Sequence, residues 1–73
     1  MVFAERLATI LRSAGPQGMS TAEVRRALEA TGYSGASGAK LGIHVSGELN
    51  RQAREGRRGI VRIAEGRYAI THS

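Results

Sequence analysis

The sequence predicts one small α+β domain, in which three helices are followed by a two-stranded β-hairpin. Apolar residues recur at helical spacing in three segments before residue 56, and a strand-like alternation replaces that spacing near the end of the chain. In addition, 73 residues with 41% hydrophobic content can form one hydrophobic core but not two. We therefore expect residues 1–73 to fold as a single domain.

The first helix is expected over residues 2–14. Phe3, Leu7 and Leu11 recur there at intervals of four, which places them along one side of a helix. The helix should end at Gly15 and Pro16, because glycine accepts a left-handed conformation and proline cannot continue the hydrogen-bond ladder.

A second helix is expected to begin after Ser20. The run from Ser20 to Glu23 is an S-x-x-E capping box, in which each of the two side chains bonds the other residue's backbone amide. Met19 and Val24 occupy the positions of a hydrophobic staple around this box. Gly32 follows at a spacing that suits the end of a short helix.

The third helix is expected from about Lys40, after a loop over residues 33–39 that holds two glycines and two serines. Its apolar side would carry Leu41, Val45 and Leu49, and then Gln52 or Ala53. Gly56 stands where a C-terminal cap is needed.

Residues 60–64 and 67–71 read as two strands joined by a two-residue turn. That turn length sets an expected register, in which two apolar pairs share one face: Ile63 with Tyr68, and Val61 with Ile70. The other face would then carry Arg62, Ala64 and Arg67.

This order of elements resembles a winged helix-turn-helix, and more narrowly the HARE-HTH family. The resemblance is carried by residues 44–56, HVSGELNRQAREG, and by the strand pair that follows them. Ile60 to Ile63 and the run GRYAI at residues 66–70 fill the places of the family pattern F-x-R-V-G-x-G-x-[FY]-A-L. The loop at residues 34–38 departs from the family because it is shorter and richer in glycine. The resemblance implies a DNA-associated module whose third helix enters the major groove and whose hairpin touches phosphates.

The charge of the chain also points to a polyanionic partner. The net charge is +5 and the isoelectric point is near 11.1. Residues 37–73 carry seven basic residues and three glutamates, so this half alone contributes +4. We therefore expect the binding surface in the second half of the chain.

Candidate contacts come from the third helix and from the hairpin. On the helix, the face opposite the apolar side carries Lys40, Ile43, Gly47, Asn50 and Arg54, flanked by His44 and Arg51. Arginine can bond guanine, asparagine can bond adenine, and isoleucine can meet the thymine methyl group. Around the hairpin, phosphate contacts are expected from Arg57, Arg58, Arg62 and Arg67. The alternative for both sets is an ordinary solvated surface.

Other kinds of function are less well supported by the sequence. The chain has no cysteine and no nucleophile or P-loop motif, so we expect no enzyme activity, no cofactor, no metal site and no small-molecule ligand. No apolar run is long enough to cross a membrane. The prediction is a DNA-binding protein of the transcription-regulator or nucleoid-associated type, located in the cytoplasm or the nucleus. A homodimer through the first helix would present two reading helices.

Two alternatives stay open at this point. The domain could be a protein-interaction winged helix that serves as an adaptor in a larger complex, with its charge providing solubility. Less favoured is RNA binding, because residues 35–38 (GASG) match the G-x-x-G loop of KH domains.

Overall fold

The computed structural model describes residues 3–70, except for the side chain of Arg57. The elements follow the order α1 (Phe3–Ala14), β1 (Met19–Ser20), α2 (Thr21–Ala30), α3 (Gly38–Glu55), the 3-10 turn η1 (Arg57–Gly59), β2 (Ile60–Ala64) and β3 (Arg67–Ile70). The prediction of an α+β domain with three helices is confirmed. The ends predicted at Val2 for the first helix and at Thr71 for the last strand lie outside the described residues.

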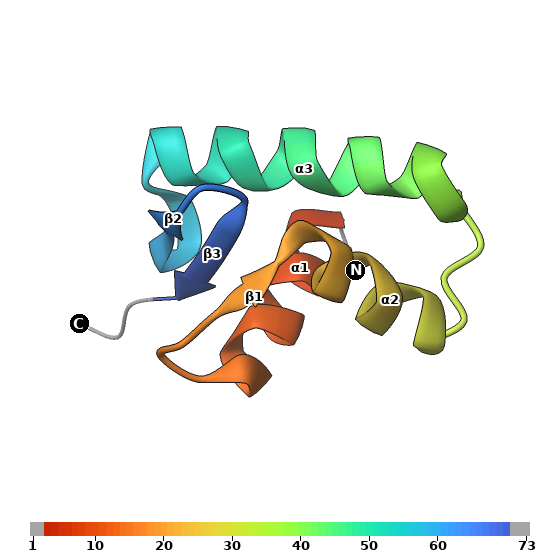
Figure 1. Cartoon of the computed structure of the whole chain (residues 1–73), viewed down its shortest axis with the longest axis horizontal. Coiled ribbons are helices and arrows are strands. Elements are labelled where there is room, and N and C mark those ends of the chain that lie inside the picture. Colours follow the sequence, from red (N-terminus) through yellow and green to blue (C-terminus); the bar gives the residue numbers. More distant parts are fainter. Residues whose placement is uncertain (1–2, 71–73) are drawn as a thin grey trace.

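The longest helix, α3, runs along one side of the molecule, and α1, α2 and the sheet all lie on its other side (Figure 1). In consequence, the outer side of α3 is left uncovered by the rest of the fold. Over residues 3–70, no helix combines the length and the apolar character that crossing a membrane requires.

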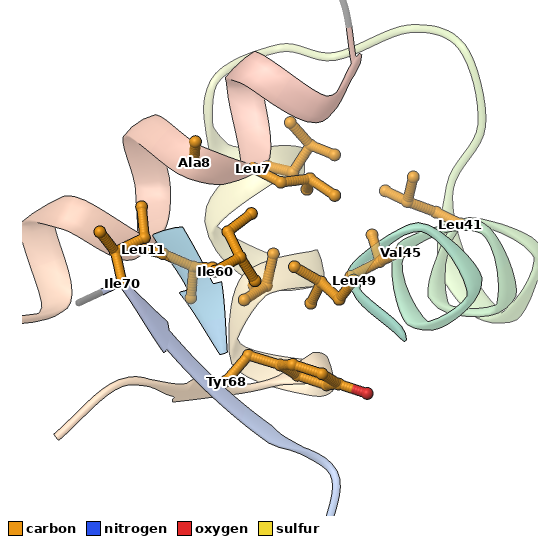
Figure 2. Packing of buried hydrophobic residues seen from close by; sticks show 11 residues of the cluster. Leu7, Ala8, Leu11, Leu41, Val45, Leu49, Ile60, Tyr68 and Ile70 are labelled. Atoms are coloured by element: carbon orange, nitrogen blue, oxygen red, sulfur yellow. The ribbon is translucent and has the colours of Figure 1, made fainter. Parts of the chain in front are cut away.

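The apolar stripes of the three helices meet the sheet in one core, as their spacing predicts. Figure 2 shows side chains of α1, α3 and the sheet converging in this core. The fully buried members include Leu7, Leu11, Val24, Leu28, Leu41, Val45, Leu49 and Ile60. Gln52 lies on the same side of α3 with 2% exposure, which confirms its predicted place.

The capping box at the start of α2 is present as predicted. The Ser20 hydroxyl accepts a hydrogen bond from the Glu23 amide at 3.2 Å, and the Ser20 amide donates to the Glu23 carboxylate at 2.9 Å. These bonds satisfy two amides that the first turn of a helix otherwise leaves unpaired. Helix α3 ends as predicted at Gly56, which has a left-handed φ of 69°.

Helix α3 begins at Gly38, two residues before the predicted start at Lys40. The reason is a tertiary contact, because the Gly38 amide donates to the carboxylate of Glu29 in α2 at 2.8 Å. The hydroxyl of the N-cap residue Ser37 makes no capping bond. A carboxylate from a neighbouring helix thus replaces the local cap, and no local sequence pattern reports that contact.

The sheet has three strands in the order β1-β3-β2, so the predicted two-stranded hairpin is incomplete. Strand β1 pairs Met19 with Tyr68 and Ser20 with Arg67. Two residues are too few to show an alternating pattern, which is why the sequence did not reveal this strand. Gly18, with φ of 68°, allows the close approach, since a Cβ there would collide with the Tyr68 carbonyl oxygen.

The predicted hairpin register is wrong by one residue. Ile60 pairs with Ile70, Val61 with Ala69, and Arg62 with Tyr68, and an irregularity then separates Arg62 from Ala64. Ile63 is the extra residue of this bulge and is 46% exposed, instead of being buried opposite Tyr68. The observed register buries Ile60 and Ile70 at 0% and 7% exposure, which accounts for its preference.

The bulge also separates two arginines that the sequence placed on one face. Arg62 lies opposite Tyr68, while Arg67 precedes Tyr68 in the same strand. Because side chains alternate along a strand, Arg62 and Arg67 belong to opposite faces of the sheet.

Candidate nucleic-acid interface

Helix α3 and strand β2 form a surface groove of about 440 Å³. We call it the α3–β2 groove, and its lining residues are Asn50, Ala53, Arg54, Val61 and Arg62. Three of them, Asn50, Arg54 and Arg62, are predicted contact residues that lie up to twelve positions apart in sequence. The fold therefore brings the polar end of the third helix and one wing arginine to a single concave surface.

A second groove of about 390 Å³ lies between the start of α2 and the first half of α3. This α2–α3 groove is lined mainly by small residues: Thr21, Ala22, Arg25, Ala39, Gly42, Ile43 and Ser46. The Arg25 side chain lies close to α3 at Gly42, where a Cβ would be in van der Waals contact with the Arg25 Cδ at 3.4 Å. Ile43 stands beside this groove with 74% of its surface exposed.

Both grooves open on the same flank of α3. Their α3 residues fall within a sector of about 120° when each residue advances the helix by about 100°. We call this sector the groove flank: Ala39, Gly42, Ile43, Ser46, Asn50, Ala53 and Arg54. Lys40 and Gly47 are exposed at its border. The flank therefore joins an apolar end near Ile43 to a cationic end near Arg54.

Arg25 belongs to this surface although it is not among the predicted contact residues. It forms an ion pair with Glu29 at 2.9 Å, one helical turn further along α2. The same Glu29 caps α3 through the Gly38 amide, so its carboxylate connects both helices of the α2–α3 groove. The i, i+4 spacing of Arg25 and Glu29 signalled the pair, but nothing in it signalled the groove.

Arg51 and Arg58 are drawn to the other side of α3, away from the groove flank. Arg51 donates to both carboxylate oxygens of Glu48, at 2.9 and 3.1 Å. Gln52 donates to the same carboxylate at 2.7 Å and accepts from Arg58 at 3.3 Å. We call these four residues the Glu48 network, and two of the predicted cationic contacts are held within it.

The charges of the Glu48 network stabilise one another. Burial raises the pKa of Glu48, but hydrogen bonds from Arg51 and Gln52 outweigh it and hold that pKa below its ordinary value of 4.5. The hydrogen bond to Glu48 in turn raises the pKa of Arg51. The positive charge of Arg51 is therefore partly compensated by the carboxylate of Glu48. His44 lies exposed on the same side of α3.

Arg58 lies beside α1 and has an unusual backbone conformation. Its φ is 57°, and it is the only non-glycine residue with positive φ in the described part of the chain. Its side chain lines a groove of about 350 Å³ together with Glu5, Ala8, Thr9 and Arg12 of α1. The predicted contact of Arg57 lies outside the described side chains.

Arg67 is engaged within the fold, contrary to its predicted place on an exposed wing face beside Arg62. Its guanidinium donates to the carbonyl oxygens of Gln17 at 2.9 Å and of Gly18 at 3.3 Å. It also reaches the Glu23 carboxylate at 3.4 Å. Arg67 therefore connects β3, the turn before β1 and the capping box of α2.

The carboxylate at the end of this connection is itself held in its charged form. The Ser20 backbone amide donates to Glu23, and this bond, followed by the one that involves the Ser20 hydroxyl, lowers the pKa of Glu23. Glu23 thus serves the start of α2 and contacts Arg67 at the same time.

Comparison of the chain with family models, curated proteins and solved structures gave no match. The resemblance to the HARE-HTH family therefore stays a prediction.

Proposed function

We propose that this protein is a winged helix-turn-helix domain that binds double-stranded DNA. Helix α3 enters the major groove with its groove flank toward the bases, and the β2–β3 hairpin lies against neighbouring phosphates. The observation that carries this proposal is the α3–β2 groove, which unites Asn50 and Arg54 of the helix with Arg62 of the hairpin. One surface thus carries the Asn50 amide, which can bond a base, and one arginine from each of the two elements.

The free charges of this surface support an anionic partner. Within residues 3–70, neither Arg54 nor Arg62 forms an ion pair, and the one hydrogen bond of the Arg62 guanidinium goes to the Ala64 carbonyl at 3.4 Å. Arg51 and Arg67, in contrast, are already bonded to carboxylates. Among these four arginines, Arg54 and Arg62 beside the groove flank are therefore the ones available for phosphates.

The same geometry favours duplex DNA over RNA. The predicted G-x-x-G loop at residues 35–38 ends at Gly38, whose amide is bonded to Glu29 and starts α3. That amide is not available to clamp a nucleic-acid backbone in the manner of a KH domain. In addition, the groove flank has no aromatic residue on which an unpaired base could stack.

The proposal is tested by the salt dependence of binding to random-sequence duplex DNA. Each neutralised phosphate contributes about −0.9 to the slope of log affinity against log salt. The double variant Arg54→Gln, Arg62→Gln should therefore bind with a slope shallower by about 1.8. The matched control, Arg6→Gln with Arg12→Gln, removes the same charge from α1 and should keep the wild-type slope.

Two outcomes would overturn the proposal. One is the absence of duplex binding by the wild type at about 50 mM salt, where phosphate contacts are strong. The other is an equal loss of slope in both double variants, because it would show that net charge alone drives the association. Single-stranded DNA and double-stranded RNA serve as competitors, and tighter binding to either would assign the surface to that nucleic acid instead.

A further inference from the structure

We infer that Ile43 and Asn50 give this domain a sequence preference. Ile43 selects the 5-methyl group of a thymine, and Asn50 selects an adenine about three base pairs away. This inference rests on the proposed DNA binding and adds to it the identity of two bases and their spacing.

The spacing follows from the positions of the two residues on α3. They are seven residues apart, which turns the helix to only about 20° short of two full turns. Both side chains therefore lie on one line along the groove flank, separated by about 10 Å. At a rise of about 3.4 Å per base pair, a helix that follows the major groove would place them about three base pairs apart.

The exposure and the surroundings of Ile43 suit an apolar contact with a bound molecule. It is 74% exposed, whereas the other large aliphatic residues of α3, Leu41, Val45 and Leu49, are fully buried. The adjoining α2–α3 groove is lined mainly by small residues, so a base edge can approach it closely. In the major groove, the apolar feature of the base edges is the thymine methyl group, and an isoleucine that faces them therefore favours thymine.

Asn50 has the complementary chemistry for adenine. It is exposed in the α3–β2 groove, and over the described part of the chain its amide makes no hydrogen bond that would have to break on binding. An asparagine amide can donate to N7 and accept from N6 of adenine, a pairing that other bases do not offer. Arg54 and Arg62 line the same groove and would hold the flanking phosphates, which positions the amide at its base.

The experiment is a selection of binding sites from a random duplex library at one fixed salt concentration, followed by affinity measurements on the selected site. Four proteins are compared: wild type, Ile43→Ala, Asn50→Ala and the control Ile63→Ala. Among the described residues, Ile63 is the other exposed large aliphatic residue, at 46%, and it lies in the hairpin. Circular dichroism confirms that each variant is folded.

We expect the wild type and Ile63→Ala to select a thymine and an adenine about three base pairs apart. Ile43→Ala should lose the thymine and Asn50→Ala the adenine, while each keeps the other base. Replacing the thymine by uracil, which lacks the methyl group, should weaken the wild type about fourfold, the effect of withdrawing one methyl group from an apolar contact. Ile43→Ala should bind both sites equally.

The possible failures are distinguishable. Duplex binding without selection of any sequence would overturn the inference and leave the proposed function standing, since the domain would then bind the backbone alone. Equal binding of thymine and uracil by the wild type would overturn the role of Ile43. No duplex binding at all would overturn the proposed function and this inference with it.

Discussion

Replacing Arg67 and Arg62 by alanine should affect different properties of the protein, although the sequence presents both as equivalent wing arginines. Arg67→Ala removes two hydrogen bonds to the carbonyl oxygens of Gln17 and Gly18. Arg62→Ala removes one long bond to the Ala64 carbonyl, at 3.4 Å. The first change should lower the stability of the fold, and the second should lower the affinity for DNA.

The size of the first effect follows from the contacts. A hydrogen bond of this kind contributes about 0.5–1.5 kcal/mol net, and the Arg67 side chain is 39% exposed, so we expect a loss of about 1–2 kcal/mol. The exposed ion pair with Glu23 adds little. In a domain of this size 1 kcal/mol shifts the melting temperature by about 4–8 °C, so Arg67→Ala should melt roughly 5–15 °C lower. Arg62→Ala should stay within about 4 °C of the wild type.

Thermal melts by circular dichroism and DNA titrations over a range of salt, at a temperature where both variants are folded, measure the two effects separately. Arg62→Ala should make the salt slope shallower by about 0.9, whereas Arg67→Ala should leave the slope near that of the wild type. If Arg67→Ala melts like the wild type and its slope falls by about 0.9, the reasoning is refuted, because Arg67 would then be a phosphate contact.

Three further outcomes are expected. Ser20→Ala should cost about 1 kcal/mol in a thermal melt, because it breaks the capping box, and an unchanged melting temperature would mean that the box does not stabilise α2. Leu49→Ala should cost about 3–5 kcal/mol, which is comparable to the whole stability of so small a domain. Far-ultraviolet circular dichroism should therefore show this variant largely unfolded at 25 °C. The variant Ile43→Ala, at an exposed position, should stay folded. The pKa values of Glu23 and Glu48 are lower in the folded chain than the ordinary 4.5, so both carboxylates stabilise the fold above that pH and lose this effect as pH falls through their folded pKa. The melting temperature should therefore fall below about pH 4.5, and a flat profile from pH 6 to pH 3 would contradict this assignment.

Local features of this chain could be predicted from the sequence, because interactions between residues close in sequence produce them. The capping box from Ser20 to Glu23 needs only four consecutive residues, and it is present with both of its hydrogen bonds. The apolar stripe of α3 is likewise a property of helical spacing, and Leu41, Val45 and Leu49 are all fully buried. The exposure of Ile43, Asn50 and Arg54 follows from the same periodicity, because residues opposite a buried stripe must face outward.

Features that depend on contacts between distant segments could not be predicted from the sequence. The third strand exists because Met19 meets Tyr68, and two residues carry no pattern of their own. Helix α3 begins at Gly38 because Glu29 reaches it from α2. The hairpin register shifted because the bulge at Ile63 allows Ile60 and Ile70 to be buried together, a gain that the turn length alone does not reveal.

The division is sharpest among the arginines of the candidate interface. The sequence by itself determined that the chain is basic and that most of its cations follow residue 37, since charge is a sum over residues. Which cations are free was decided by the tertiary structure. Arg51 and Arg67 form ion pairs with carboxylates, Arg58 lies beside α1, and Arg54 and Arg62 line one groove. The physical reason is that an ion pair depends on distance in space, and distance in space is a property of the whole fold.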